Sequence, residues 1–198
     1  MTESERKQII ALIQREVIPA IGCTEPIAVA LCVAKATETL GAKPEKIKVL
    51  LSANILKNAM GVGIPGTGMI GLPIAVALGA LIGKSDYQLE VLKDSTPEAV
   101  EEGKKLIDEK RICISLKEDI TEKLYIEVTC EAGGEQATAI ISGGHTTFVY
   151  VAKGDEVLLN KQQTSGEEEE EETLELTLRK VYDFALTAPF DEIRFILE

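Results

Sequence analysis

The stretch KLYIEVTCEAGGEQATAIIS, residues 123–142, decides the fold of this 198-residue chain. Its first half is apolar at alternate positions, a pattern that places one face of a β-strand in a protein core. The positions concerned are Leu124, Ile126, Val128 and Cys130. Two glycines follow at 133 and 134 as a turn, and QATAIIS supplies a second strand. The stretch therefore predicts an antiparallel hairpin.

Similar strand patterns lie on both sides of this hairpin, and helical patterns lie between and beyond them. The predicted strands are KIKVLLS at 46–52, RICISL at 111–116, TFVYVA at 147–152 and EVLLNK at 156–161. Helical spacing predicts helices near 4–18, 25–40, 53–61, 72–83, 96–110 and 174–186. For the second helix, Thr24 is the expected N-cap and Gly41 the expected stop. We expect an α+β fold in which helices pack on one face of a largely antiparallel sheet.

The chain is expected to divide into three parts. Residues 1–165 form the α+β domain and residues 173–198 a helical segment that leads toward a further domain. Between them lies an acidic loop at 166–172, because the six consecutive glutamates Glu167 to Glu172 repel one another and favour solvation. An alternative role for this run is to bind a protein partner.

Composition argues against two classes of partner. The formal net charge is -12 and lysine and arginine are not clustered, so nucleic-acid binding is not expected. Residues 59–83 carry no charge, but Pro65, Pro73 and seven glycines would leave backbone groups unpaired in lipid, so a membrane span is not expected either. The charged start MTESERKQII does not have the pattern of a signal peptide, which favours a cytoplasmic location.

The glycine-rich stretch at 61–71 contains two nucleotide-binding patterns that we reject. GVGIPG and GTGMIG match G-x-G-x-x-G, but a predicted helix precedes them where the dinucleotide turn needs a strand. GALIGKS at 79–85 lacks the spacing of a phosphate loop. The stretch has two remaining interpretations: a loop whose backbone N–H groups bind an anion such as a carboxylate, or a simple connection between helices.

Cys23 and His145 are the two side chains whose neighbouring residues suggest a metal-binding or catalytic role. Cys23 precedes a helix N-terminus, where the helix dipole stabilises a thiolate that binds metal or attacks electrophiles. Cys32, Cys113 and Cys130 are expected to be structural, since buried thiols behave as small hydrophobes. His145 is the single histidine and follows two glycines; a structural and a catalytic role both remain open.

Several longer stretches together resemble the L-cysteine desulfidase and serine-dehydratase-like family of iron–sulfur lyases. These are GCTEPIAVALCVAKA at 22–36, NILKNAMGVGIPGTGMIGLPIAVALGALIG at 54–83, LEVLKD at 89–94, ISGGHTTFVYV at 141–151 and PFDEIRFILE at 189–198. The resemblance implies a β-elimination that converts cysteine to pyruvate, ammonia and sulfide, or serine to pyruvate and ammonia. It also implies a [4Fe-4S] cluster in the full-length enzyme and no pyridoxal phosphate.

By the same resemblance, Cys23 would be a cluster ligand, and Lys57 and His145 would be catalytic. The substrate-binding residues would be Glu25, Asn58, Pro65, Gly66, Thr67, Gly68, Gly144 and Thr146. Which group removes the α-proton, and whether cysteine or serine is the substrate, stay open.

The family's chains are much longer than this one, and their remaining cluster cysteines lie in a second, helical domain. Cys32, Cys113 and Cys130 are not at matching positions, and one thiolate does not hold four irons. The chain therefore resembles the N-terminal half of such an enzyme and is expected to be inactive without its C-terminal half. Expected partners are a small amino-acid substrate, that C-terminal half, and a second copy in a homodimer. The alternative function is a non-catalytic module that binds an amino acid or anion.

Overall fold

The computed structural model describes residues 1–161 and 176–197 of the chain. Two compact units make up the chain, residues 20–164 in one and residues 1–19 with 165–198 in the other. The N-terminal helix, expected inside an α+β domain spanning 1–165, is thus grouped with the C-terminal helices instead. The acidic loop expected at 166–172 lies outside the described residues.

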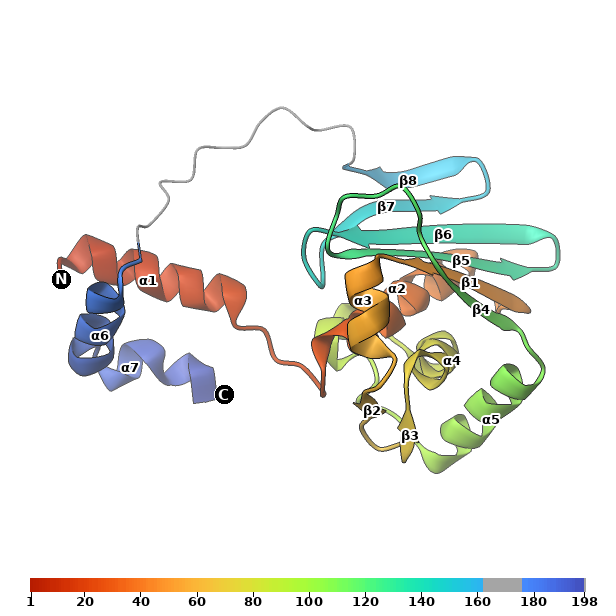
Figure 1. The fold of residues 1–198 in the computed structure, drawn as a ribbon, viewed down its shortest axis with the longest axis horizontal. Helices are drawn as coiled ribbons and strands as arrows, with labels where there is room; N and C mark the ends of the chain where they lie inside the picture. The colour runs from red at the N-terminus through yellow and green to blue at the C-terminus, as the bar shows by residue number, and fades with distance from the viewer. Residues whose placement is uncertain (162–175, 198) are drawn as a thin grey trace. The chain divides into compact units, whose positions relative to one another are not determined.

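A six-stranded sheet forms one side of the larger unit, with the strand order β4-β1-β5-β6-β7-β8 (Figure 1). The strands are β1 Lys46–Leu51, β4 Ile112–Leu116, β5 Tyr125–Ala132, β6 Glu135–Ser142, β7 Phe148–Lys153 and β8 Glu156–Asn160. The hairpin predicted from residues 123–142 is confirmed as β5 and β6, which pair antiparallel from Tyr125 with Ser142 to Ala132 with Glu135. Every other pair is antiparallel too, except that β1 and β4 run parallel. The largely antiparallel sheet is confirmed.

Helices pack in layers against one face of this sheet, which confirms the α+β fold (Figure 1). The helix α2, Thr24–Leu40, packs on β5 and β6; α4, Leu72–Ile82, packs on α2; and α5, Pro97–Asp108, packs on α4. A short helix α3, Ala53–Ala59, follows β1, and a 3₁₀ helix η1, Ser85–Glu90, follows α4. Because α2 lies between the sheet and α4, nearly all of its apolar side chains are buried.

The ends of α2 follow from its flanking residues, with one correction. Cys23, not Thr24, is the N-cap, with extended backbone angles and no side-chain cap hydrogen bond. Gly41 ends the helix as predicted, in the left-handed conformation with φ 76°. The helix therefore begins at Thr24, and the Cys23 side chain lies at its first turn.

The uncharged window 59–83 divides into a small β-ribbon and a buried helix. Strands β2, Gly63–Ile64, and β3, Met69–Ile70, pair antiparallel, a feature that the expected loop did not include. The Thr67 hydroxyl donates to the Ile64 carbonyl at 2.7 Å and accepts from the Met69 N–H at 3.0 Å. No helix in the described parts of the chain combines the length and the apolar character needed to cross a membrane.

All secondary structure in the described part of the smaller unit is helical. It contains α1 Glu3–Glu16, α6 Leu178–Thr187, α7 Phe190–Ile193 and the 3₁₀ helix η2 Arg194–Leu197. A capping box between Thr2 and Glu5 begins α1. Ion pairs connect α1 to the C-terminal helices, from Arg6 to Glu192 at 2.9 Å and from Lys180 to Glu5 at 3.3 Å. The last helix was expected over residues 174–186, but α6 begins at Leu178, after the N-cap Thr177; residues 174 and 175 lie outside the described part.

Candidate functional site

The strongest cluster of predicted site residues lies at the start of α2. The Cys23 thiol is partly buried and donates to Glu25 Oε2 at 3.1 Å. The Thr24 hydroxyl donates to the same oxygen at 3.3 Å. From α3, Asn58 Nδ2 donates to Glu25 Oε1 at 3.3 Å. The Glu25 carboxylate therefore receives three donors and joins two segments that are 33 residues apart.

These hydrogen bonds decide the charges of the cluster. The hydrogen bond from Cys23 is the main reason that the pKa of Glu25 lies below its ordinary value. The same bond, followed by burial, raises the pKa of the Cys23 thiol. We expected the helix N-terminus to stabilise a thiolate here, and this expectation is wrong because the charged Glu25 carboxylate accepts a hydrogen bond from the thiol and disfavours its ionisation. The resting cluster is a neutral thiol beside a charged carboxylate.

Gly22 brings the glycine-rich ribbon against this cluster. Its φ is +99°, and a Cβ at this position would lie 2.8 Å from Pro65 Cγ. The preceding Ile21 N–H donates to the Leu89 carbonyl at 3.0 Å, which fixes the segment from the other side. Leu89 follows Gln88, whose φ of 51° and ψ of -128° form a kink inside η1. Only a glycine permits both the positive φ and the close approach of Pro65, so Gly22 belongs to the site although the sequence patterns did not single it out.

The tip of the ribbon is open to solvent. Gly66 and Gly68 have positive φ, and a Cβ on either would meet no atom within 4 Å. Pro65 is exposed and Thr67 is half-buried, with its hydroxyl already used inside the ribbon. Lys57, on α3 next to Asn58, is exposed and makes no side-chain hydrogen bond or ion pair with any described residue. The open backbone at Gly66 and Gly68 leaves room for an anionic group.

The predicted residues around His145 form a separate tight turn between β6 and β7. The Thr147 N–H donates to the Gly144 carbonyl at 3.2 Å, and the Ser142 N–H to the Thr147 carbonyl at 3.1 Å. His145 and Thr146 are half-buried. Within the described residues, no hydrogen bond or ion pair joins this turn to Cys23 or Glu25. The contacts thus bring together Cys23, Glu25, Asn58 and Pro65, and the roles of Gly144, His145 and Thr146 stay predictions.

The other three cysteines do not approach the cluster. Cys32 is fully buried and donates to the Ala139 carbonyl at 3.3 Å, and Cys130 is also buried, with Thr37 Oγ1 3.6 Å away. Burial raises the pKa of Cys130 to about 11. Cys113 was expected to be a structural, buried thiol, but it is exposed on the edge strand β4. Residues 1–161 and 176–197 contain no group of three or more His, Cys, Asp or Glu that could hold a metal ion.

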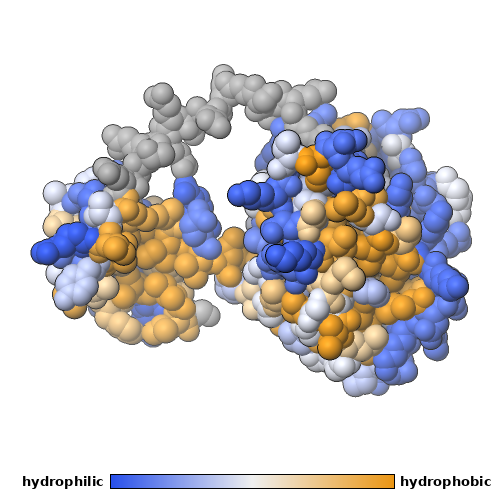
Figure 2. All heavy atoms as spheres, viewed as in Figure 1, coloured by the Kyte–Doolittle hydropathy of each residue, from blue (hydrophilic) through white to orange (hydrophobic). Residues whose placement is uncertain are grey.

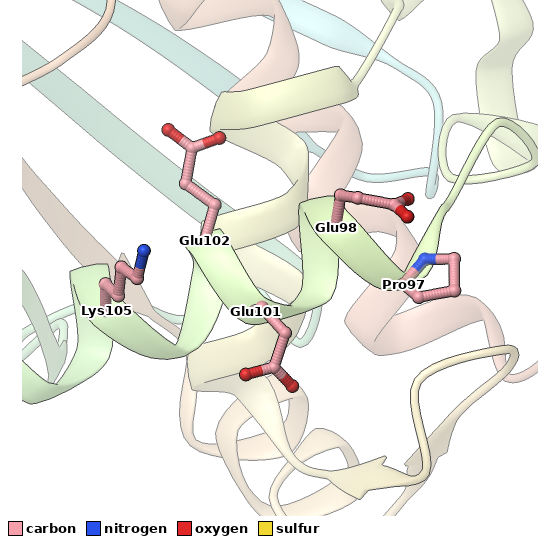
Figure 3. Close-up of a pocket in the computed structure, with 5 residues that line it drawn as sticks. All are labelled: Pro97, Glu98, Glu101, Glu102 and Lys105. Atoms are coloured by element: carbon pink, nitrogen blue, oxygen red, sulfur yellow. The ribbon is translucent and has the colours of Figure 1, made fainter.

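Two hollows of the larger unit lie at other residues. One, of about 520 Å³, is lined only by residues of α5: Pro97, Glu98, Glu101, Glu102 and Lys105 (Figure 3). Another, of about 460 Å³, is lined by Gly134, Gly154 and the strand ends beside them. Neither contains a predicted site residue. In the first, Glu102 pairs with Lys43, and Glu101 pairs with Lys104 at 2.6 Å, as is typical of a solvated helix face.

Comparison with known proteins finds relatives that match nearly the whole chain, and their names state no activity. No protein-family model matches the chain. It is 99% identical over 198 residues to the UPF0597 protein of Bacteroides fragilis, and 48% identical over 204 aligned positions to that of Porphyromonas gingivalis. The UPF0597 protein of Aeromonas hydrophila is 42% identical over 192 residues, or 96% of this chain. The chain spans 46%, 47% and 43% of these proteins, which is less than half of each. It is therefore similar throughout to one part of the longer UPF0597 proteins.

Proposed function

We propose that this chain is the N-terminal portion of an iron–sulfur-dependent amino-acid lyase. The enzyme would be of the L-cysteine desulfidase or L-serine dehydratase type, and the chain alone would be inactive. The observation that carries this proposal is the cluster of Cys23, Glu25 and Asn58, which places a partly exposed thiol beside an anchored carboxylate. Support also comes from the motif resemblance and from the greater length of the relatives.

The described residues supply only one suitable ligand for a four-iron cluster. Cys23 is partly exposed, whereas Cys32 and Cys130 are enclosed in the core and Cys113 lies on an edge strand. A [4Fe-4S] cluster is commonly held by four thiolates. This chain by itself does not fit the cluster, so the remaining ligands in our proposal come from the part of the longer protein that this chain does not cover.

The chain's own groups suit the binding of an α-amino acid. The Glu25 carboxylate is charged at neutral pH and presents two oxygens to cationic donors such as a substrate ammonium group. The exposed backbone at Gly66 and Gly68 is open to close approach by the substrate carboxylate. Lys57, beside Asn58, is a candidate to remove the α-proton in the β-elimination, and His145 is the other candidate.

The alternative is a non-catalytic module that binds an amino acid or another anion. The open backbone at Gly66 and Gly68 supports it, because an anionic group can approach there closely without the participation of Cys23. The two proposals differ in whether ligand binding to this chain alone needs iron and the rest of the longer protein.

Iron reconstitution of the longer Bacteroides fragilis relative tests the enzyme proposal. After anaerobic addition of iron and sulfide, we expect a visible charge-transfer band and formation of pyruvate from cysteine or serine. Cys23→Ala should weaken the band and abolish pyruvate formation, whereas Cys113→Ala, an exposed thiol outside the cluster, should change neither. Equal behaviour of the two variants, or a protein that binds no iron, would contradict the proposal. Calorimetric binding of amino acids to the iron-free 198-residue chain would favour the module.

A further inference from the structure

The exposed face of α6 carries a continuous apolar stripe. Its members are Leu178, Val181, Tyr182, Ala185 and Leu186, and all five are exposed. The stripe is well solvated, with exposed fractions of 92% for Leu178, 61% for Tyr182 and 67% for Leu186. Its spacing of three, four, seven and eight residues is that of a helix face that packs against another element. Figure 2 shows hydrophobic side chains gathered over the smaller unit.

The opposite face of α6 makes the contacts within its own unit. Phe184 is 9% exposed, and Lys180 pairs with Glu5 of α1. Among the described residues of this unit, Ile9 and Phe184 are the buried apolar side chains. The stripe is therefore a second apolar face of α6, separate from the face that packs inside the unit. Exposed apolar faces of this kind on a folded protein commonly mark an interface.

We propose that the α6 stripe is the docking surface for the part of the longer protein that this chain does not cover. Three relatives align with 96–100% of this chain, at 42–99% identity, and more than half of each relative lies outside the match. The stripe contains no charged residue, so it fits an apolar helix or sheet face. This inference rests on the proposed function in one respect: both treat the chain as part of a longer protein.

The charges around the stripe favour this occupant over a lipid surface. Amphipathic helices that lie on membranes present many Lys and Arg residues on the polar face. The described part of α6 offers Arg179 and Lys180, and these are paired with Asp183 at 3.1 Å and with Glu5 at 3.3 Å. A protein surface is therefore the partner, and a second copy of the chain is the other protein candidate that the experiment separates.

Charge substitution in two contexts is the first test. In the 198-residue chain the stripe is solvated, so Tyr182→Glu with Leu186→Glu should leave its thermal midpoint within about 1 °C of wild type. In the longer Bacteroides fragilis relative the same pair should lower the midpoint by about 5 °C or more, because two charges would enter an apolar interface. Val157→Glu, at a position that is 51% exposed on β8, is the matched control and should have the same small effect in both proteins. Equal shifts of the double variant in the two proteins would overturn the inference.

Photo-crosslinking identifies the occupant without a destabilising change. A benzophenone amino acid replaces Tyr182 in the longer relative, with the same replacement at Val157 as control. We expect Tyr182 crosslinks to segments of the same polypeptide that lie outside the match. Crosslinks to the matched segment of a second chain, to vesicles of mixed anionic lipid, or to nothing would overturn the inference. Neither readout involves iron or pyruvate: a buried stripe in a protein that binds no iron refutes the proposed function alone, and an exposed stripe in an active enzyme refutes this inference alone.

Discussion

Cys23 and Glu25 share a hydrogen bond of 3.1 Å from Sγ to Oε2 across the first turn of α2. The bond makes the thiol and the carboxylate one electrostatic unit. It raises the pKa of Cys23 and lowers the pKa of Glu25, and both effects keep the proton on sulfur. Any reaction that requires the Cys23 thiolate must first remove this proton against the charge of Glu25.

Glu25→Gln should make Cys23 more reactive. A neutral amide no longer repels the thiolate, so the pKa of Cys23 should fall and its alkylation by iodoacetamide should become faster at pH 7.5. Mass spectrometry of the modified chain over a pH series measures this rate. Cys113 is exposed and serves as the internal control, whose rate should not change. An unchanged pH profile at Cys23 would show that the bond to Glu25 does not control the thiol.

Gly22→Ala should disrupt the approach of the glycine-rich ribbon to Cys23. The new Cβ would lie 2.8 Å from Pro65 Cγ, on a backbone with φ of +99°. We expect a loss of about 2 kcal/mol in the free energy of unfolding, combining steric overlap with backbone strain. Gly41→Ala is the control, since its φ is +76° but no atom lies within 4 Å of the added Cβ. Urea denaturation should give the larger loss for Gly22→Ala, and equal losses would argue against contact between Gly22 and Pro65.

Local patterns were sufficient to predict most helices and strands, but not the longer-range pairings. The β5–β6 hairpin follows from alternation and a glycine turn, both of which are local signals. The parallel pairing of β1 with β4 joins residues 65 positions apart, such as Ile47 and Ile112, and no local pattern specifies it. Cys113 was expected to be structural, but it pairs with the exposed Lys48 on the face of β4 opposite to Ile112 and Ile114, a face that the alternation of the strand already indicated.

The candidate site shows the same division. A cysteine before a helix was visible in the sequence, but the bond between Asn58 and Glu25 depends on how α3 packs against α2. Cys23 is a neutral thiol, where a thiolate was expected, because of Glu25, which lies two residues away. Its effect depends on a side-chain orientation that sequence spacing does not fix.

Gly79→Ala should separate the helices α2 and α4. A Cβ at Gly79 would lie 2.6 Å from the Ala30 carbonyl oxygen, which is backbone and cannot rotate away. We expect a loss of about 3 kcal/mol in the free energy of unfolding, at the upper end of overpacking effects. Gly61→Ala is the matched control, because no atom lies within 4 Å of its added Cβ. A small effect at both positions would mean that the two helices are less closely packed than described.

The buried thiol of Cys130 should make stability fall at alkaline pH. Burial raises its pKa to about 11 in the folded chain, above the ordinary value of 9.0 that applies in the unfolded chain. Below about pH 9 both states bind the thiol proton, so the full contribution to stability is present. As the pH rises from 9 toward 11, the unfolded state loses the proton first, and the free energy of unfolding should fall by about 1.4 kcal/mol per pH unit.

Urea denaturation under reducing conditions at pH 7.5, 9.5 and 10.5 measures this loss. Lysines and tyrosines also titrate in this range, so the contribution of Cys130 is isolated by comparing slopes between variants. Cys130→Ala should lower stability at pH 7.5 through lost packing, yet should show a shallower decline between pH 9.5 and 10.5, since it has no thiol to ionise. Cys113→Ala, at an exposed thiol, should keep the wild-type slope. If Cys130→Ala also keeps the wild-type slope, the prediction is contradicted. The thiol would then ionise as easily in the folded chain as in the unfolded chain, despite its burial between the sheet and α2.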